Sequence, residues 1–583
     1  MSFYKNIKQI TVCCLLFTVC CALSIAQHPN SHILFSQPPP TILQKPLSAP
    51  QPPNQKSDNA PQPLQSPPPP QLEKFGKSLV YLENAATMDF DTTLSASVQV
   101  LRGDVRFRQD NVQLFCDSAY FYQEDNSVDA FSNVKMVQGD TLFLYGDMLF
   151  YDGNTKIARV YYNVRMVDRD VTLTTDSLLF DRNRNVGYYN AGGKIVDKSN
   201  TLTSLIGEYH PSERIALFKT AVKLVNPDFV LRSDTLRYNT VSKIANIVGP
   251  SHIVYKGKTT IKSSNGWYDT DKEYSQLFDR SIVYNTDGKF LTGDTIFYNR
   301  KDSIGIAMHN VVIRDTAQKV NLYGNYGYYN EKEHAGFVTQ HAMLEQVSDT
   351  DTLYMHADTL ATAKDSTYNI AKAYHGVRVF RSDFQAVCDS LFYSERDSVM
   401  RCFGNPVGWA DEQQITGNEM YAYSKNKELD YIHVIRSAFA SQQVDSIRFN
   451  QLSGKELKAY FAKRQIYKVF VSGNAESIFF PQDSKDSSLI GMNSTQSSFL
   501  TMYINNKKID KVVLTPASNG TMTPIDLAKK DDMYLKNYTW QEELRPKDKD
   551  DIFRIIVRSK ETTPSHQRHK IQSDKTPDNH AKK

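Results

Sequence analysis

The chain has 583 residues, of which 40% are hydrophobic and 23% are charged, and its formal net charge is +4. A chain of this length holds enough apolar residues for a large core, and its small net charge gives no sign of the basic face that nucleic-acid binding requires. We therefore expect a folded protein without a nucleic-acid partner.

Residues 1–26 are typical of a cleavable secretory signal peptide. An apolar run extends from Ile10 to Ile25, and Ser24 and Ala26 supply the small residues of a cleavage site. The run falls short of the roughly 20 apolar residues that a membrane span needs. We predict export, and the alternative is an uncleaved or lipid-modified anchor at one of the cysteines in the run.

Three cysteines, Cys116, Cys388 and Cys402, follow the signal, and none belongs to a CxxC pair. This number and spacing fit neither a disulfide scaffold nor a zinc site. We expect free buried thiols, with a Cys388–Cys402 bridge as the alternative.

Two segments have the composition of unfolded chain. Residues 27–75 are rich in proline, glutamine and serine, which predicts an extended, semi-rigid linker. Residues 558–583 are polar and basic, and we expect a disordered tail there.

The region from about residue 76 to 515 repeats. The typical copy has a small residue, then Asp or Asn as an anchor, an aliphatic residue two positions later and an aromatic residue four positions later, as in LYGDMLFYD, LTTDSLLFD and LRSDTLRYN. The anchors recur about every 30 residues. They are Asp117, Asp147, Asp176, Glu208, Asp234, Ser264, Asp294, Asn325, Asp358, Asp389 and Asn418.

A second motif recurs between the anchors with the same period, as NVKMV, NVRMV, GGKIV and AVKLV. Each unit is rich in Tyr, Phe, Val, Ile and Thr, with turn-like joints such as YDGNTK, and predicts two or three strands. One unit cannot bury its own apolar face, so the units must stack. The sequence therefore predicts an all-β fold, elongated and built from stacked strand repeats, with strand edges at its ends.

No motif in the chain predicts catalysis, a cofactor or a metal site. GxSxG, HExxH, the P-loop and a helix-opening GxGxxG are absent, and the 13 histidines have no metal-ligand spacing. The anchors occupy one place in every unit, which favours a structural role at strand ends or turns over metal binding. We predict that the protein is not an enzyme.

The aliphatic and aromatic positions of the anchor motif share one face of a strand, because side chains two positions apart point the same way. That face is either a packed core between two sheets or the lining of a groove that takes up acyl chains. Both demand apolar residues, so the sequence leaves both open. The candidate groove residues are Leu149, Tyr151, Leu178, Phe180, Leu236, Tyr238, Ile296, Tyr298, Leu391 and Tyr393.

The anchor unit, with NVxMV-type strands between its copies, resembles the OstA-like domain of lipopolysaccharide-transport proteins. Within a C-terminal closing segment (residues 516–557), Asn537 to Phe553 also resembles the end of large OstA-like proteins. The chain is several times longer than the small periplasmic members of that family, and a proline-rich linker precedes its repeats.

The resemblance implies a β-jelly-roll, or β-taco, with an apolar interior that holds lipopolysaccharide by its lipid A acyl chains. It implies a periplasmic bridge between an inner-membrane extraction complex and an outer-membrane translocon, contacted through the end strands, or a location at the outer membrane. No cofactor is implied. The alternatives are a secreted or surface structural β-solenoid, such as a stalk or adhesin without lipid cargo, and an outer-membrane assembly component.

Overall fold

The computed structural model describes residues 78–90, 98–286, 288–316, 319–348, 351–365, 367–425, 428–462, 465–483, 488–505 and 508–556. The predicted signal peptide, proline-rich linker and basic tail lie outside the described residues and stay predictions.

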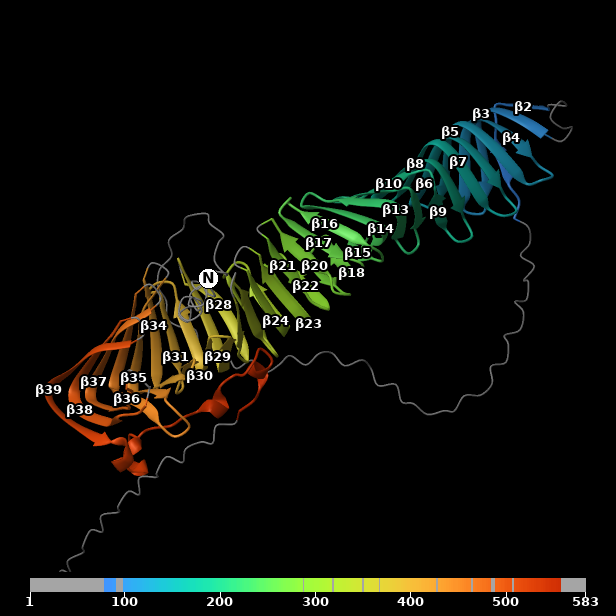
Figure 1. The fold of residues 1–583 in the computed structure, drawn as a ribbon. Helices are drawn as coiled ribbons and strands as arrows, with labels where there is room; N and C mark the ends of the chain where they lie inside the picture. Colours follow the sequence, from blue (N-terminus) through green and yellow to red (C-terminus); the bar gives the residue numbers. More distant parts are fainter. Residues whose placement is uncertain are drawn as a thin grey trace, which may run out of the picture. The chain divides into compact units, whose positions relative to one another are not determined.

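The described residues form β-strands and four short 3-10 helices, so the predicted all-β fold of stacked repeats is confirmed (Figure 1). The strands belong to two compact units. The N-terminal unit holds the described residues up to Thr339 and those of Ala361–Asn369, and the C-terminal unit holds Gln340–Leu360 and the described residues from Ile370 onward.

The N-terminal unit contains strands β1 to β25, and its described pairings are antiparallel. Their bounds are β1 Tyr81–Asn84, β2 Thr87–Phe90, β3 Val98–Gln109, β4 Val112–Tyr122, β5 Ser127–Gln138, β6 Leu142–Asp152, β7 Ile157–Asp168, β8 Val171–Asp181, β9 Val186–Tyr189, β10 Gly193–Val196, β11 Thr201–Ser204, β12 Ile206–His210, β13 Ile215–Val225, β14 Phe229–Asn239, β15 Ile244–Ile247, β16 Ser251–Tyr255, β17 Thr259–Ser263, β18 Gly266–Asp269, β19 Tyr274–Leu277, β20 Ile282–Asn285, β21 Lys289–Thr292, β22 Thr295–Asn299, β23 Ile304–Asp315, β24 Val320–Asn330 and β25 Ala335–Thr339.

The long strands of this unit bend once in the middle. In β5, Ser132 and Asn133 have φ of 61° and 48°, and the register with β4 and β6 shifts there. Equivalent left-handed pairs lie at Tyr162–Asn163 in β7 and at His309–Asn310 in β23. Each bend places the two halves of a strand on different walls. Wall A is our name for the wall that contains residues 134–138 of β5 and the other NVxMV-type segments. Wall B is our name for the wall that contains the aliphatic and aromatic positions of the anchor motif.

The anchors stabilise the bends. The Nδ2 of Asn133 donates a 2.7 Å hydrogen bond to Asp117, and the Nδ2 of Asn163 donates one of 2.6 Å to Asp147. Asn310 and Asp294 form the same pair at 2.8 Å. Side chains that bond locally in this way favour turns and irregular backbone. These contacts agree with a structural role for the anchors.

One predicted anchor was wrong. The backbone N–H of Leu205 donates a 3.0 Å hydrogen bond to the carbonyl of Thr220 across a bend. The anchor Asp294 makes the equivalent bond, in which its backbone N–H donates to the carbonyl of His309 at 2.9 Å. Leu205 therefore occupies the anchor position, and Glu208 lies three positions later on wall B. An apolar residue at the anchor hid this copy of the motif.

The neighbouring strand explains why glycine precedes two of the anchors, Asp147 and Asn325. A Cβ added to Gly146 would lie 2.4 Å from Cγ1 of Val160, and one added to Gly324 would lie 2.4 Å from Cγ1 of Val338. The inner corner of the bend is filled by that valine, so a larger side chain has no room.

The core of the N-terminal unit lies between its two walls. Inward side chains of both walls form one buried cluster that runs from β3 to β23. Opposite walls are in contact: the rings of Phe107 and Phe121 are 5.3 Å apart, and those of Phe229 and Tyr268 are 4.8 Å apart.

The C-terminal unit continues the same strand pattern with longer last strands. The remaining elements, including β28 and β29, which contribute to both units, are β26 Met343–Val347, β27 Thr352–His356, β28 Thr359–Asp365, β29 Tyr368–Arg381, β30 Phe384–Ser394, β31 Val399–Phe403, β32 Val407–Ala410, β33 Gln413–Thr416, β34 Glu419–Lys425, β35 Glu428–Gln443, β36 Phe449–Ala462, β37 Gln465–Phe479, β38 Gly491–Asn505, β39 Lys508–Pro524, η1 Ile525–Leu527, η2 Lys530–Met533, η3 Glu542–Leu544 and η4 Asp551–Phe553.

Residues 525–556, which we call the strap, cross the outer face of this unit. Two buried glutamines hold the strap backbone by paired bonds. Gln414 donates to the carbonyl of Thr539 and accepts from the N–H of Gln541, both at 2.8 Å. Gln451 makes the same pair of 2.8 Å bonds with Met533 and Leu535.

Candidate functional site

The candidate site is the interior of the N-terminal unit, between wall A and wall B. Bends close it on one side. On the opposite side the free ends of the two walls meet along a line that we call the seam. The inner surface is apolar throughout the described strands from β3 to β23.

The structure places the predicted groove residues of the N-terminal unit in this interior. Leu149, Tyr151, Leu178, Phe180, Leu236, Tyr238 and Ile296 are each at most 4% exposed, whereas Tyr298 is partly buried. Leu391 and Tyr393 are buried in the C-terminal unit, at 8% and 2% exposure. The inward direction of these positions thus agrees with the motif, but burial alone does not distinguish a filled core from a groove that opens.

The seam is held by polar contacts that recur about once per unit and that we call latches. In the first latch, the Tyr151 hydroxyl of wall B donates to Oε1 of Gln109 at the end of wall A. Arg182 donates to the same oxygen at 2.9 Å, and Gln109 donates to the carbonyl of Gly153 at 2.9 Å. Lys156 adds a 2.8 Å ion pair with Asp110.

The second latch joins Tyr209 of wall B to Asp168 of wall A. The Tyr209 hydroxyl donates a 2.8 Å hydrogen bond to Asp168, and both residues are 1% exposed. Arg214 forms an ion pair with Asp170 beside it.

The third latch is the most extensive. The Tyr238 hydroxyl donates to Asp197 at 2.5 Å, and Lys243 pairs with the same carboxylate at 2.9 Å. Asn200 donates from Nδ2 to the Tyr238 hydroxyl at 2.9 Å and to Thr270 at 3.0 Å.

A fourth contact follows one unit later. The guanidinium of Arg300 lies 3.5 Å from the ring centroid of Tyr255 and 4.0 Å from Asp228, both at the end of wall A. A cation over a desolvated aromatic face is attracted to the ring, so this contact also holds the walls together.

The latches shift the pKa values of their members. Burial raises the pKa of the Tyr209 and Tyr238 hydroxyls above its ordinary value, and the carboxylates of Asp168 and Asp197 raise it further. Burial by itself would raise the pKa of Asp197, but hydrogen bonds from Tyr238 and Lys243 outweigh it and hold that pKa below its usual value. The tyrosines are therefore neutral donors and Asp197 is a carboxylate at neutral pH.

Hydrogen bonding at the seam is incomplete. Buried side-chain atoms there lack a hydrogen-bond partner among the described residues: Oε1 of Gln138, Nε of Arg182, Nε of Arg214, Oη of Tyr255 and Nη1 of Arg300. Each such group costs free energy when it is buried without a partner. The seam is accordingly less stable per contact than the continuous strand ladders of the walls.

Sequence reasoning missed one latch tyrosine. Tyr209 has the aromatic position of the copy whose anchor is Leu205, but the misplaced anchor at Glu208 hid it. The signal was available, because Ser204 and Leu205 restore an even spacing of 29 residues to Asp176 and to Asp234.

Nothing among the described residues suggests a metal centre, since no group of three or more His, Cys, Asp or Glu side chains could hold an ion. Among the described residues, Cys116, Cys388 and Cys402 form no disulfide; Cys116 and Cys388 are buried and Cys402 is half-buried. Burial raises the pKa of the Cys116 thiol to about 12, so it is a thiol and not a nucleophilic thiolate at neutral pH.

Among the described residues, none of the helices has the length and hydrophobicity needed to span a membrane.

Residues 77–234 match the family described as OstA-like protein. These residues form an OstA-like region. The predicted resemblance is thereby confirmed for a segment that spans β1 to the bend of β14 and includes the latches at Gln109 and Asp168. The OstA-like match indicates a β-fold of the lipopolysaccharide- or lipid-transport type. No curated protein matches the chain.

Proposed function

We propose that the interior of the N-terminal unit binds the acyl chains of lipopolysaccharide and that the chain is a periplasmic bridge that carries this lipid towards the outer membrane. The observation that carries the proposal is a continuous apolar interior, closed along one side only by separate polar latches. The OstA-like match supports the lipid class.

The free energy needed to open a latch is comparable to the free energy gained when acyl chains are buried. Opening one latch costs about 1–3 kcal/mol for each buried hydrogen bond to a charged group. Burying acyl methylenes returns about 0.8 kcal/mol each, so a handful of them offsets one latch. The seam is therefore the side through which an acyl chain enters the interior, because separating two paired strands within a wall would break many more hydrogen bonds.

The strands at the ends of the fold are suited to docking with partner proteins. The last strand, β39, is paired with β38 along one side, and Val512 and Met522 on its inner face are 45% and 49% exposed. An edge of this kind accepts a further strand. We propose that the partners, an inner-membrane extraction complex and an outer-membrane translocon, contact the protein through end strands.

A structural β-solenoid without cargo is the second candidate. The near-complete burial of Leu149 and Leu236 favours it, because their inward side chains fill the space between the walls. The two functions differ in whether the walls separate.

Mass spectrometry of lipids that co-purify with the full chain tests the proposal. The chain is expressed in a lipopolysaccharide-producing cell and purified without detergent. Near-stoichiometric lipopolysaccharide supports a carrier; a folded protein without lipid supports the stalk. Leu149→Asp should abolish co-purification of the lipid, whereas Met148→Asp, on the opposite face of β6, should retain it. If Leu149→Asp does not fold, the result with the unmodified chain still decides between the two functions.

A further inference from the structure

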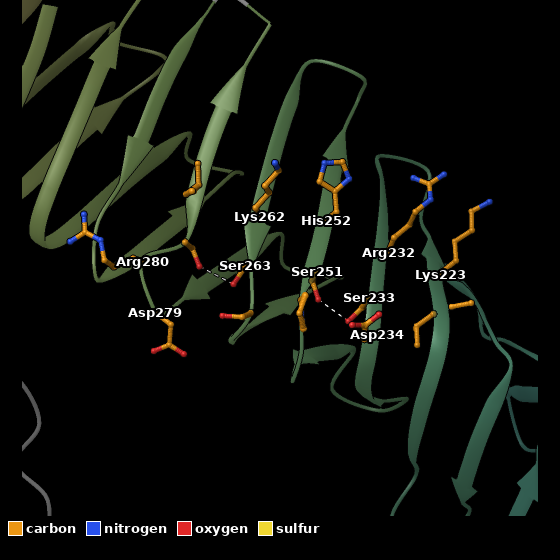
Figure 2. A pocket seen from close by; sticks show the side chains of 16 residues that line it. Lys223, Arg232, Ser233, Asp234, Ser251, His252, Lys262, Ser263, Asp279 and Arg280 are labelled. Carbon is orange, nitrogen blue, oxygen red and sulfur yellow. Dashed lines mark hydrogen bonds between the residues drawn. The ribbon is translucent and has the colours of Figure 1, made fainter.

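Wall A carries a row of basic side chains on its outer face. Lys223 in β13, Arg232 in β14, His252 in β16 and Lys262 in β17 are directly opposite one another in consecutive strand pairs. Figure 2 shows the four side chains side by side on neighbouring strands, with Asp234 below them. Neighbouring strands are about 4.8 Å apart, so the charges of Lys223 and Arg232, which are directly opposite each other, are closely spaced.

This arrangement is unfavourable in isolation. Like charges directly opposite one another on neighbouring strands destabilise a sheet. Among the described residues, no carboxylate lies within ion-pair distance of Lys223, Arg232 or Lys262. Two acids, Asp234 and Asp279, lie at the bend beside the row, and Asp279 accepts a 2.9 Å hydrogen bond from Asn265. The row thus lacks a counter-charge of its own.

The row continues towards the start of the unit with one cation on every second strand. Lys194, Arg165 and Lys135 follow in register on β10, β7 and β5. The strands between them contribute Thr203, Thr174 and Tyr145 at this level. We call the whole set, from Lys135 to Lys262, the cationic row.

An apolar row runs parallel to it. Val225, Val230 and Val254 point outward from the same strands two positions away, and Val225 is 37% exposed. From β5 to β17, neither row contains an acidic residue. The outer face of wall B differs, because Asp129 and Glu208 occur in its corresponding row.

A hollow of about 720 Å³ opens beside the row, lined by Lys223, Arg232, His252 and Lys262 together with the bend residues Asp234 and Asp279 (Figure 2). A group with negative charge that enters the hollow meets the basic side chains together.

We propose that the cationic row is a docking surface for the phosphate headgroups of an anionic lipid bilayer. Phosphates supply the missing counter-charge, and the valine row contacts the boundary between headgroups and acyl chains. Basic residues near an anionic surface each add to attraction within a Debye length of about 8 Å in physiological salt. A soluble polyanion would use the cations but would gain nothing from the valines, which favours the bilayer.

The test is binding of the full chain to vesicles of phosphatidylglycerol and phosphatidylcholine, compared with vesicles of phosphatidylcholine alone. The test variant combines Arg165→Glu, Lys223→Glu and Arg232→Glu. The control combines Arg159→Glu, Lys219→Glu and Arg237→Glu, which makes the same charge change on β7, β13 and β14 but on the outer face of wall B. All six side chains belong to exposed residues, so both variants should fold, which circular dichroism checks.

The proposal predicts that the chain prefers the anionic vesicles. The wall A variant should bind them at least about a hundredfold more weakly, from roughly fivefold per basic residue, and the wall B variant should bind them within a few-fold of the unmodified chain. Equal loss in both variants, or no preference for anionic vesicles, would overturn it. Binding of inorganic pyrophosphate without binding of vesicles would overturn it as well, by assigning the row to a free anion.

Discussion

The hydroxyl of Tyr238 donates a 2.5 Å hydrogen bond to Asp197, which lies 41 positions earlier in the chain on the opposite wall. The ring of Tyr238 belongs to the apolar interior, and its hydroxyl belongs to the seam. The aromatic position of the repeat therefore has two roles in this unit: it fills the space between the walls and holds their free ends together.

Removal of that hydroxyl should loosen the third latch. Tyr238→Phe leaves Asp197 with Lys243 and backbone donors, so we expect the free energy of unfolding to fall by about 1–3 kcal/mol. Hydrogen exchange of amides in the turns at the seam should accelerate. Tyr188→Phe, which removes a hydroxyl from the outer face of wall B, is the control and should change neither; an equal effect in both variants would contradict the latch.

The pKa shifts predict how stability depends on pH. Asp197 has a pKa lowered by folding, so its contribution is present above the unfolded value of about 3.9 and is lost as the pH falls through the lower folded value. Tyr209 and Tyr238 have raised pKa values, so their contribution is present below about 10 and is lost in more alkaline solution. Urea unfolding across this range should show a plateau with losses at both ends. For Asp197→Asn the acid-side loss should be smaller, and an unchanged profile would argue against this assignment.

The bend leaves no room for a side chain at Gly146. A Cβ there would lie 2.4 Å from Cγ1 of Val160, so Gly146→Ala should destabilise the protein by about 1–3 kcal/mol. Val160→Ala removes the clashing atom, and the double variant should lose less than the sum of the single losses. Gly249→Ala is the control, since its nearest contact would be an ordinary 3.7 Å. Strict additivity in thermal unfolding would show that the two residues do not compete for space.

The strap depends on its buried glutamines. Gln414→Ala removes two 2.8 Å bonds and leaves the carbonyl of Thr539 and the N–H of Gln541 without this partner. We expect trypsin to cleave the strap sooner than in the unmodified chain. Gln413→Ala, at the exposed neighbouring position of β33, should leave the cleavage rate unchanged. Equal protection in both variants would mean that apolar packing alone holds the strap.

The repeat, the all-β fold and the inward direction of Leu149, Leu178 and Leu236 could be predicted, because strand periodicity and the 30-residue spacing are local properties of the sequence. The latches could not. Asp168 and Asp197 resemble ordinary polar residues at strand ends, and their partners Tyr209 and Tyr238 lie about 40 positions away. Only the fold of each strand into two walls brings them together.

The cationic row was missed for a related reason. The small net charge suggested no basic face, yet Lys135, Arg165, Lys194 and Lys223 occupy equivalent positions of the second motif and therefore line up on one wall. Net charge averages over faces that only strand register separates.

The central claim is that lipid lies between the walls, and site-specific photo-crosslinking tests it most directly. A photoreactive phenylalanine derivative replaces either Phe180, which is buried in the interior, or Phe150, which points outward from wall B. Both versions are expressed in cells that make lipopolysaccharide and are irradiated before purification. The account predicts a lipopolysaccharide adduct at position 180 and none at position 150. Adducts of equal yield at both positions, or no adduct at position 180 in a folded protein, would contradict it.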